Sequence, residues 1–552
     1  MKSKYTLLIL LIAATSCAFA QYSGGAGSGY SKAEANGKHL TNFFQTDGNW
    51  STNGNWRDSQ LPASTEEANV AAHATLDNNY SYPAVNILSG ASLTVAGSTN
   101  LTVTETLTNS AGSPGLVIES GGSLLHNTND VQATIKRAVT GAPIPAEPGV
   151  STKYHLVSIP LAQSVNSLSS QFTGAYLYEY APLTNSWAAL GEQTNTPLSE
   201  TLGYMVYYTS NQTITFAGPI NNGSFSPSLT YAGLGGGYNF SLIPNPYPSA
   251  IDWHAFAPAD KTNVGNTIWI FNNGNYATYT WDGEYSSSTN SGSRYIAVGQ
   301  AFFVQTTGNS PALNMSNAVR THTTSPFLKN TNTPDKQLRM SAQANGLNDE
   351  ALITFRQNAS DEYLSSEDAL KFYGSSGAPQ LYSLAGSQKL SVNNMHQPKG
   401  TTDVPLAFEC DLAGDYSLSF SQLETFPESV SLYLTDHLSE TTHNLRENAV
   451  YQFSHQPGNA AGRFSITFGG SIGVEENLLP ETKILSENDR ITIMLPTSEQ
   501  AAVKVYNTTG QLVHQTAFTG NQHSISMAQP GIYLVQVSSG KNIFTGKVHT
   551  GR

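Results

Sequence analysis

Short runs in which every second residue is apolar recur along most of the chain. Clear examples lie at residues 351–355, 416–420, 491–495, 502–506 and 531–537. A period of two, together with many β-branched and aromatic residues, is typical of half-buried strands. Clusters of Gly, Pro, Asn and Ser separate the runs, as turns would. We therefore predict an all-β, multidomain protein.

The first β-rich region, 40–140, contains an internal repeat. The phrase I-x-S-G-x-S-L stands at 87–93 and again at 118–124. Short strands at even spacing with small turn residues predict a short β-solenoid, whose stacked coils bury one another's apolar side. Trp50 and Trp56 precede the repeat. We expect them to cap the open end of the solenoid, although an indole can also stack on a sugar ring.

A second internal repeat spans 150–315. The phrase Y-H-L-V-S-I-P at 154–160 is followed by Y-N-F-S-L-I-P at 238–244, and an aromatic run at 203–208 is followed by another at 299–304. We predict two tandem β units with the same strand order. Two prolines exclude a central strand at 245–253, so we expect an ordered loop there that leads into a short helical turn.

Three further segments complete the organisation. Five alternating runs between 336 and 470 predict a β-sandwich, and 471–483 reads as a linker to a small C-terminal β-domain, 484–552. The 552 residues exceed what a single core of about 250–300 residues holds. Several domains are therefore expected on length alone.

Composition changes the picture in one respect. Charged residues make up 12% of the chain, against roughly 25% in average proteins, and the formal net charge is −13. This favours an extracellular β protein. The acidic excess argues against nucleic acid or anionic lipid as a partner.

The N-terminus resembles a secretory signal peptide over residues 1–20. Lys2 and Lys4 precede an apolar run, and Ala18 and Ala20 form a small-x-small cleavage site before Gln21. The apolar run is shorter than the roughly 20 residues that cross a bilayer. We expect no transmembrane segment in the mature chain and a flexible Gly/Ser-rich segment at 21–39.

The chain has two cysteines. Cys17 lies in the expected signal peptide and offers a lipoprotein alternative, which the small Ala14 three positions earlier disfavours. Cys410 is then alone, so the mature chain cannot form an internal disulfide. Its neighbours Phe408 and Leu412 share its strand face. A buried, unreactive thiol is therefore expected.

The C-terminal domain carries the most specific motifs. The phrases V-x-V-Y-N-x-x-G-x-x-V at 503–513 and P-G-I-Y-L-V-x-V at 530–537, followed by a late Lys-Val, resemble the type A C-terminal sorting domain of type IX secretion in Bacteroidetes. The residues that carry the resemblance are Tyr506, Gly510, Pro530, Gly531, Tyr533, Val535, Lys547 and Val548.

That resemblance implies an Ig-like β-sandwich that the type IX machinery recognises, and a protein that is secreted or held at the outer-membrane surface. Gly531 should be a turn residue tolerating positive φ. Ile532 and Leu534 should share one strand face, and Tyr533 and Val535 the other. The motif N-P-Y-P-S-x-I-D-W at 245–253 is similar to one in large Bacteroidetes surface proteins with the same sorting domain, and carries no established chemistry.

Catalytic and metal-binding motifs are weak. The sequence has no H-E-x-x-H, C-x-x-C or Walker motif. Residues 469–473 match G-x-S-x-G, but a linker follows where a nucleophile elbow needs a helix. Asp282 and Glu284 could form a glycosidase-like pair, yet two residues apart on one strand they would only share a face. His155, His254 and His322 show no ligand spacing.

Three acidic pairs lie within twenty residues: Asp349-Glu350, Asp361-Glu362 and Glu367-Asp368. Solvated loop charge is the main interpretation. Calcium, which takes six to eight oxygen ligands, is the alternative. We predict no other cofactor.

All six tryptophans precede residue 282, which hints at a binding surface. We expect most to be core and Trp253 to be exposed as a ligand contact. The leading hypothesis is a non-enzymatic surface or adhesion protein that binds a glycan or another surface protein. The alternatives are a carbohydrate-active enzyme or its binding subunit, marked by a cleft with two carboxylates about 5–9 Å apart, and a structural spacer.

Overall fold

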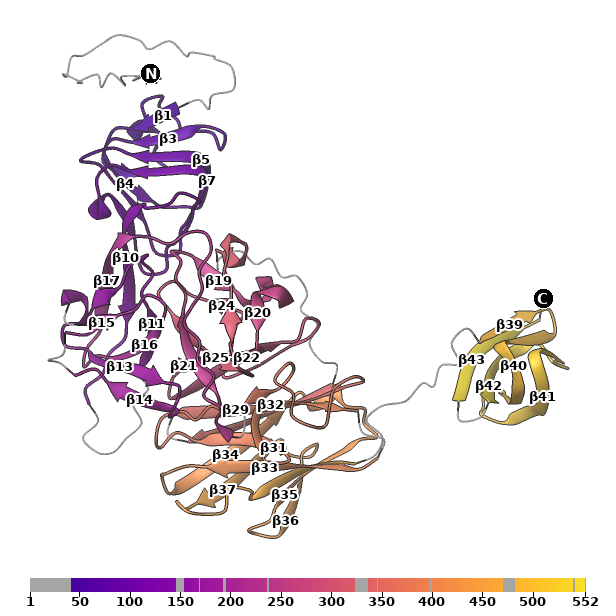
Figure 1. The fold of residues 1–552 in the computed structure, drawn as a ribbon. Coiled ribbons are helices and arrows are strands. Elements are labelled where there is room, and N and C mark those ends of the chain that lie inside the picture. Colours follow the sequence, from indigo (N-terminus) through magenta and orange to yellow (C-terminus); the bar gives the residue numbers. More distant parts are fainter. Residues whose placement is uncertain are drawn as a thin grey trace, which may run out of the picture.

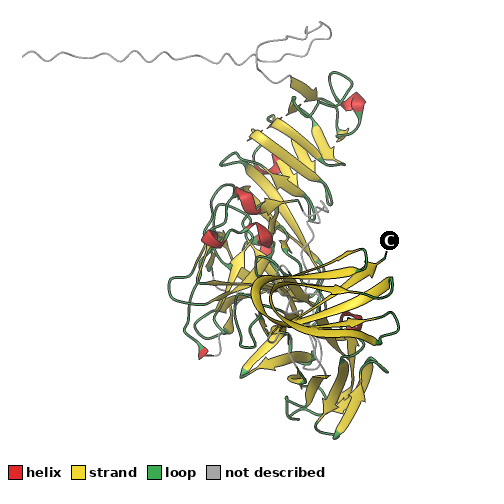
Figure 2. Ribbon diagram, turned by 90° about the vertical axis from the view of Figure 1, so that its right-hand side faces the viewer, coloured by secondary structure: helices red, strands yellow, loops and turns green. Residues whose placement is uncertain are grey.

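The computed structural model describes residues 41–144, 153–167, 169–191, 195–235, 238–322, 336–344, 346–397, 400–469, 482–539 and 542–551. The expected signal peptide with Ala18, Ala20 and Gln21, the segment 21–39, most of the linker 471–483 and most of the G-x-S-x-G motif lie outside these ranges. The all-β fold class is confirmed (Figure 2). The helical elements of the described residues are single 3₁₀ turns: η1 (Asn53–Asn55), η2 (Ser113–Gly115), η3 (Ser170–Phe172), η5 (Trp253–Ala255), η6 (Pro258–Asp260), η7 (Asn317–Val319) and η8 (Leu423–Thr425).

The N-terminal unit is a two-sheeted β-solenoid (Figure 1, indigo). Odd-numbered strands form one parallel sheet: β1 (Thr41–Phe44), β3 (Glu67–Val70), β5 (Tyr80–Ile87), β7 (Asn100–Asn109) and β9 (Ser123–Leu125). Even-numbered strands form the other: β2 (Gly48–Asn49), β4 (His73–Leu76), β6 (Ser92–Val95), β8 (Leu116–Ile118) and β10 (Gln132–Val139). Because successive strands alternate between the sheets, the chain coils around a continuous apolar interior.

Aromatic rings close the first coil. Trp50 and Trp56 are buried, and their ring centroids lie 4.7 Å apart in an edge-to-face contact. The Trp50 indole donates to the Tyr82 hydroxyl at 3.0 Å, and the Trp56 indole donates to the Trp50 carbonyl at 2.8 Å. With both N–H groups satisfied and both rings in the core, the capping role agrees with the structure.

Two antiparallel sheets follow. The first has the order β11 (His155–Ser158), β16 (Gly203–Tyr207), β13 (Tyr176–Ala181), β14 (Ser186–Ala189). The second has the order β18 (Phe240–Pro244), β25 (Ala301–Thr306), β21 (Val264–Asn272), β22 (Asn275–Trp281), β23 (Ser286–Thr289). The strand order is the same in both, as the sequence repeat predicts, and β23 is an addition in the second unit.

Smaller pairs extend the likeness between these two units. β12 (Val165–Asn166), which precedes η3 in the chain, pairs with β15 (Pro197–Leu198). In the same way β19 (Ala250–Asp252), which precedes η5, pairs with β24 (Tyr295–Ile296). β27 (Arg320–Thr321) also joins β19, and β20 (Lys261–Thr262) pairs with β26 (Ala312–Leu313). β17 (Gln212–Pro219) leaves the first unit and pairs along all of β10, which ties it to the solenoid.

The third unit is one sheet folded over itself. Its strands are β28 (Lys336–Ala344), β29 (Leu347–Arg356), β30 (Ala369–Leu370), β31 (Gln380–Ala385), β32 (Gln388–His396), β33 (Thr402–Glu409), β34 (Gly414–Ser421), β35 (Ser431–Asp436), β36 (Thr441–Asn444), β37 (Val450–His455) and β38 (Phe464–Gly469). The hairpin of β31 and β32 continues the sheet from one layer to the other, so the expected two-layered sandwich is a single hydrogen-bonded path. A separate cluster joins Leu352, Leu390 and Val392 of this unit to Leu156, Phe240 and Phe303 of the two preceding units.

The C-terminal domain has its own core (Figure 1, yellow). Its strands are β39 (Lys483–Glu487), β40 (Arg490–Tyr506), β41 (Leu512–Ser526), β42 (Gly531–Ser539) and β43 (Asn542–Thr550). The runs at 491–495 and 502–506 are the two halves of one strand, β40, whose pairing with β41 shifts between Met494 and Glu499. One half pairs with β39 and the other with β42, which gives the domain two layers.

Candidate functional site

A cavity of about 420 Å³ lies where the two repeated units meet the third unit, and we call it the aromatic cavity. It is lined by Tyr180, Asn185, Trp187, Tyr238, Phe240, Tyr276, Lys371, Phe372, Tyr373 and Lys389. Seven of these ten side chains are aromatic, and they come from segments that are remote in sequence. A concave, mostly apolar surface with a few polar groups is the usual form of a small-molecule site.

The first unit supplies one wall. Tyr180 on β13 stands opposite Trp187 on β14, with ring centroids 5.4 Å apart. The Tyr180 hydroxyl donates to Asn185 Oδ1 at 2.5 Å, which fixes the turn of this hairpin. Trp187 is half-buried, and its indole N–H has no hydrogen-bond partner among the described residues. The wall therefore offers an aromatic face and an unused donor.

The second and third units supply the floor. The ring centroid of Phe372 lies 4.6 Å from that of Phe240 and 4.3 Å from that of Tyr276. The Trp269 indole donates to the Leu370 carbonyl at 3.1 Å, which holds the segment carrying Phe372 against the second unit. Because this bond joins residues 101 positions apart, the floor exists only when both units are folded.

A network of four side chains forms the rim. Lys389 Nζ donates to the Tyr373 hydroxyl at 2.6 Å and to Glu409 Oε1 at 3.1 Å, and Tyr373 donates to the same carboxylate oxygen at 2.7 Å. Tyr382 also donates to Glu409 Oε1. Lys389 Nζ lies 5.1 Å and 5.0 Å from the ring centroids of Tyr373 and Tyr382, within cation–π range. Within the described part of the chain, the other oxygen of Glu409 and one Lys389 proton remain unused.

The rim keeps fixed protonation states at neutral pH. Burial raises the pKa of Tyr373 and of Tyr382, so both phenols stay protonated and act as donors. Burial opposes ionisation of Glu409, but hydrogen bonds from Tyr382, Tyr373 and Lys389 outweigh it and lower the pKa of Glu409. Burial likewise opposes the charge on Lys389, whereas its bonds to Tyr373 and Glu409 raise its pKa. At neutral pH the rim therefore carries one positive charge, on Lys389, and one negative charge, on Glu409, and the two charges cancel.

A smaller pocket of about 270 Å³ shares Tyr373 with the aromatic cavity and is also lined by Glu409, Cys410 and Asp411. The Cys410 thiol is buried, as expected, and accepts a hydrogen bond from the Tyr416 hydroxyl at 3.1 Å. A histidine does lie close in space, but His455 bonds the Cys410 carbonyl at 2.9 Å and not the sulfur.

The prediction that Trp253 is exposed is wrong. Its side chain is fully buried, and its indole donates to the Asn266 carbonyl at 2.9 Å. The expectation that two prolines exclude a central strand from 245–253 is wrong at the end of that segment, because β19 follows the prolines and pairs with both β24 and β27. A 3₁₀ turn does follow, capped by Asp252, which accepts from the His254 N–H. The turn directs Trp253 inward against Phe256 and Phe302, where loop composition gave no sign of a core.

The interpretation of the acidic pairs as solvated loop charge is also wrong for several members. Asp349 is fully buried and paired with the buried Lys371 at 2.5 Å. Glu350 pairs with Arg339 at 2.9 Å, and Glu367 with Arg356 at 2.8 Å. Over the ranges that the structure describes, no three ligating side chains gather as a metal site would require.

Asp282 is likewise engaged. It pairs with Arg356 and accepts the backbone N–H groups of Glu284 and Tyr285 at 2.8 Å and 2.6 Å. These bonds make it the capping residue of a turn. The pair Asp282 and Glu284 therefore does not face a cleft.

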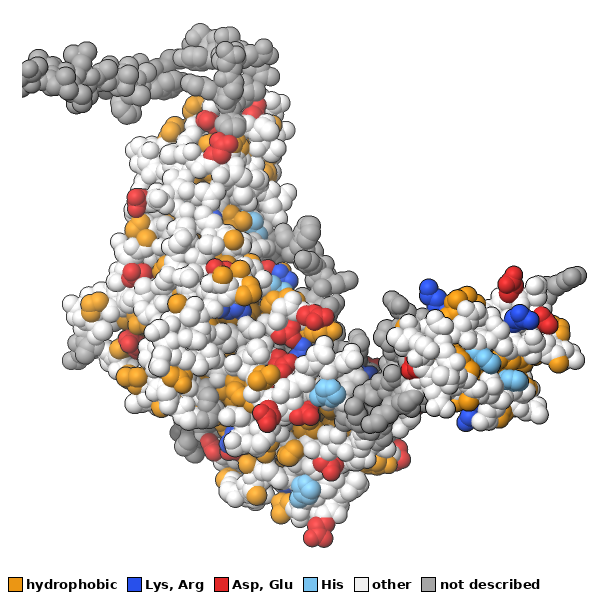
Figure 3. Space-filling model, turned by 45° about the vertical axis from the view of Figure 1, so that its right-hand side comes forward, with side chains coloured by type: hydrophobic (Ala, Val, Ile, Leu, Met, Phe, Trp, Pro, Cys, Tyr) orange, Lys and Arg blue, Asp and Glu red, His pale blue; other side chains and the backbone are white. Residues whose placement is uncertain are grey.

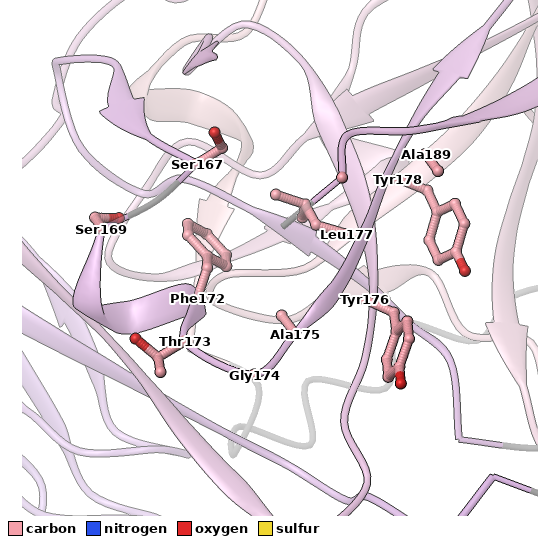
Figure 4. A pocket seen from close by; sticks show the side chains of 11 residues that line it. Ser167, Ser169, Phe172, Thr173, Gly174, Ala175, Tyr176, Leu177, Tyr178 and Ala189 are labelled. Atoms are coloured by element: carbon pink, nitrogen blue, oxygen red, sulfur yellow. The ribbon is translucent and has the colours of Figure 1, made fainter. Parts of the chain in front are cut away.

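Another cavity of about 420 Å³ lies beside η3 and β13 (Figure 4). Ser167, Ser169 and Phe172 line one side, and Tyr176 and Tyr178 extend from β13 on the other. It adjoins positions 168 and 192–194, which lie outside the described residues. We therefore assign no ligand to it.

The structure divides the sorting-signal residues into two groups. Tyr533, Val535 and Val548 are buried in the C-terminal core, whereas Tyr506 and Lys547 point outward. The strand-face prediction is confirmed, because Ile532 and Leu534 are exposed.

The turn prediction for Gly531 is wrong. Gly531 lies at the start of β42, paired with Thr550, and is not among the residues with positive φ. Gly510 holds the positive φ, +80°, in the turn that Asn507 caps. Pro530 comes immediately before β42.

Sequence reasoning did not identify the aromatic cavity. The position of all six tryptophans, Trp187 among them, before residue 282 was the one available signal. Lys389 and Glu409 gave none, because their proximity depends on the pairing of β31 with β32 and β33. Tyr373 gave none either, since it lies between β30 and β31 and meets Lys389 and Glu409 only in the folded chain.

Comparison with known proteins gives two family matches. The family described as "Domain of unknown function (DUF8693)" matches residues 44–468, and "Secretion system C-terminal sorting domain" matches residues 487–549. A search of curated proteins found no match. In the part of the chain that the structure describes, no helix has the length and apolarity to cross a membrane.

Similarities to solved structures are partial. PorZ, an essential surface component of the type IX secretion system of Porphyromonas gingivalis, is 14% identical, with a TM-score of 0.12. That match covers 30% of this chain and 23% of PorZ. The apo β-glucuronidase of Ruminococcus gnavus is 10% identical, with a TM-score of 0.10, over 25% of this chain and 36% of the enzyme. The chain thus spans well under half of either protein, and at these scores neither similarity bears on function.

Proposed function

The chain belongs to the family described as a domain of unknown function (DUF8693) and ends in a secretion-system sorting domain, and from this premise we propose that it is a non-enzymatic surface protein that binds an extracellular saccharide in the aromatic cavity. The sorting domain makes it a secreted or cell-surface protein, a cargo of type IX secretion. We include in the proposal that residues 1–20 act first, as a signal peptide that brings the chain to the periplasm.

The observation that carries the proposal is the pairing of aromatic walls with unused polar groups. A sugar ring has apolar C–H faces and equatorial hydroxyls, so it suits aromatic rings that also have donors and acceptors nearby. Trp187 and Tyr238 supply rings with free polar atoms, and Lys389 supplies a remaining donor. Glu409 beside it has a remaining acceptor and lines the adjoining smaller pocket. Because the rim charges cancel, a neutral saccharide fits better than an anionic one.

The geometry favours binding over hydrolysis. Glycosidases flank the scissile bond with two carboxylates. Among the described residues, the lining of the aromatic cavity contains two lysines and no carboxylate, and Glu409 at the rim already accepts three hydrogen bonds. Binding therefore explains these contacts with fewer assumptions than catalysis, and a pure spacer would not need the cavity.

The test is a glycan array with the full-length protein, followed by titration of the strongest neutral saccharide. Trp187→Ala and Tyr373→Ala should each weaken binding about two- to twelvefold, since an aromatic contact contributes roughly 0.5–1.5 kcal/mol. Tyr176→Ala is the matched control, because Tyr176 is 39% exposed against 38% for Tyr373 and lies outside the cavity. Saccharide binding that both cavity variants retain would refute the assignment.

A further inference from the structure

The C-terminal domain exposes an apolar row on the outer side of one layer. Strand pairing sets Leu512, Tyr506, Leu534 and Lys547 side by side on β41, β40, β42 and β43. Directly paired residues point to the same side of a sheet. The row therefore crosses the whole layer.

Exposure distinguishes this face from the core side. Leu534, Leu512 and Ile532 are 47%, 44% and 40% exposed, whereas Tyr533 and Val535, which alternate with them, are 7% and 0% exposed. Scattered single apolar residues need no explanation, but contiguous patches mark interaction surfaces. Here the exposed residues are neighbours across strands.

Basic side chains border the row. Lys504 and Gln536 are paired on β40 and β42 two residues beyond it, and His549 is paired with Ile532. Lys504, Lys547 and His549 are all exposed. The register places no carboxylate among these positions. Figure 3 shows apolar and basic side chains next to each other on the surface of this domain.

We infer that this surface, made of Tyr506, Leu512, Ile532 and Leu534 with Lys504 and Lys547, is where the type IX machinery recognises the folded domain; we call it the sorting face. The inference rests on the proposed export route. It assigns the machinery an apolar patch bordered by carboxylates, since the sorting face offers apolar area within a basic border.

Two observations favour the secretion machinery over a second copy of this chain. Tyr506 and Lys547 belong to the motif that identifies the sorting domain, yet neither contributes to its core. A second copy would bring basic border against basic border, which is unfavourable. The opposite outer face has exposed Leu485 and Met494 but none of the motif residues.

The test uses the full chain in a host with type IX secretion. Leu534→Glu combined with Lys547→Glu should reduce the fraction of protein at the surface at least tenfold and leave it in the periplasm. Leu485→Glu is the matched control, since Leu485 is 51% exposed on the opposite layer, and it should export within twofold of wild type. Protease resistance of the retained variant must show that its C-terminal domain is folded.

A chain lacking residues 542–551 separates the two proposals. If that deletion is exported normally, the export route itself is wrong. If the deletion is retained but the folded double variant reaches the surface, only the sorting face is overturned. Equal loss of export with Leu485→Glu would also overturn it. A dimer in solution that the double variant abolishes, with export intact, would mean that a second copy covers this face.

Discussion

At the scale of the residue, charged side chains are few in this protein, and one ion pair of them is fully buried. Lys371 and Asp349 have side chains 2% and 0% exposed, and Asp349 also accepts the Leu381 N–H at 2.5 Å and the Asn290 side chain at 2.9 Å. Burying two charges is costly, and their attraction offsets the cost only when their remaining hydrogen-bond donors and acceptors also have partners. Asp349 meets that condition through its bonds to Lys371, Leu381 and Asn290, whereas Lys371 Nζ, which lines the aromatic cavity, bonds Asp349 alone among the described residues.

Lys371→Met should therefore be strongly destabilising. It would leave the Asp349 carboxylate buried without its cation, which costs about 3–5 kcal/mol. Lys371→Met with Asp349→Asn should recover part of the loss, because the uncompensated charge is gone. Thermal unfolding of the full chain is the measurement, and a single variant as stable as wild type would contradict the argument.

At the scale of the element, turns and strand faces decide which motif residues matter for folding. Gly510 adopts φ +80° with open space around it. A side chain there meets no atom but forces an unfavourable backbone, at about 1–2 kcal/mol. At Gly531, a Cβ would meet only the Tyr533 ring, at 3.9 Å.

We predict opposite outcomes at these two glycines. Gly510→Val should lower the stability of the C-terminal domain, and Gly531→Ala should be close to neutral. Denaturant unfolding of the full chain, followed through protease sensitivity of that domain, measures both. Comparable destabilisation by Gly531→Ala would show that its backbone is constrained in a way that its dihedral does not reveal.

Local pattern accounts for much of the element scale and for little of the site. The alternation of Tyr533 and Val535 with Ile532 and Leu534 follows from period two, and the repeated phrases at 154–160 and 238–244 carry the shared strand order. The burial of Trp253 does not follow from local pattern, because a proline-rich loop can still turn its indole inward. The partners of Asp349 and Asp282 are 22 and 74 positions away. The spacing of residues within a short segment does not predict contacts between residues so far apart. The aromatic cavity is built from contacts of this kind.

At the scale of the whole molecule, the units share cores. Leu352 and Val392 pack with Phe240 and Phe303, so the repeated units and the third unit depend on one another. Residues of the solenoid and the first repeated unit likewise form one cluster. The single family match across 44–468 agrees with this dependence, since it covers the solenoid, the repeated units and the third unit together. The C-terminal domain, with a separate core, can be recognised independently of these units.

The junction between the solenoid and the second repeated unit should weaken in acid. His322 bonds Ser123 at 2.7 Å and Thr102 at 3.0 Å, and Arg320 donates to the His126 carbonyl at 2.7 Å. Burial, reinforced by Arg320, lowers the pKa of both histidines to about 4.

The sign of the pH effect follows from that direction. Because the folded pKa lies below the ordinary value of 6.5, the unfolded chain binds more protons between pH 6.5 and 4. Stability from these groups is complete above pH 6.5 and falls as the pH drops towards 4. His322→Gln keeps a hydrogen-bonding side chain without a titrating group. Its melting temperature should fall less than that of wild type between pH 7 and pH 5, by roughly 2–4 °C for each kcal/mol involved. Parallel melting curves for both proteins over that range would mean that His322 does not titrate in the folded chain.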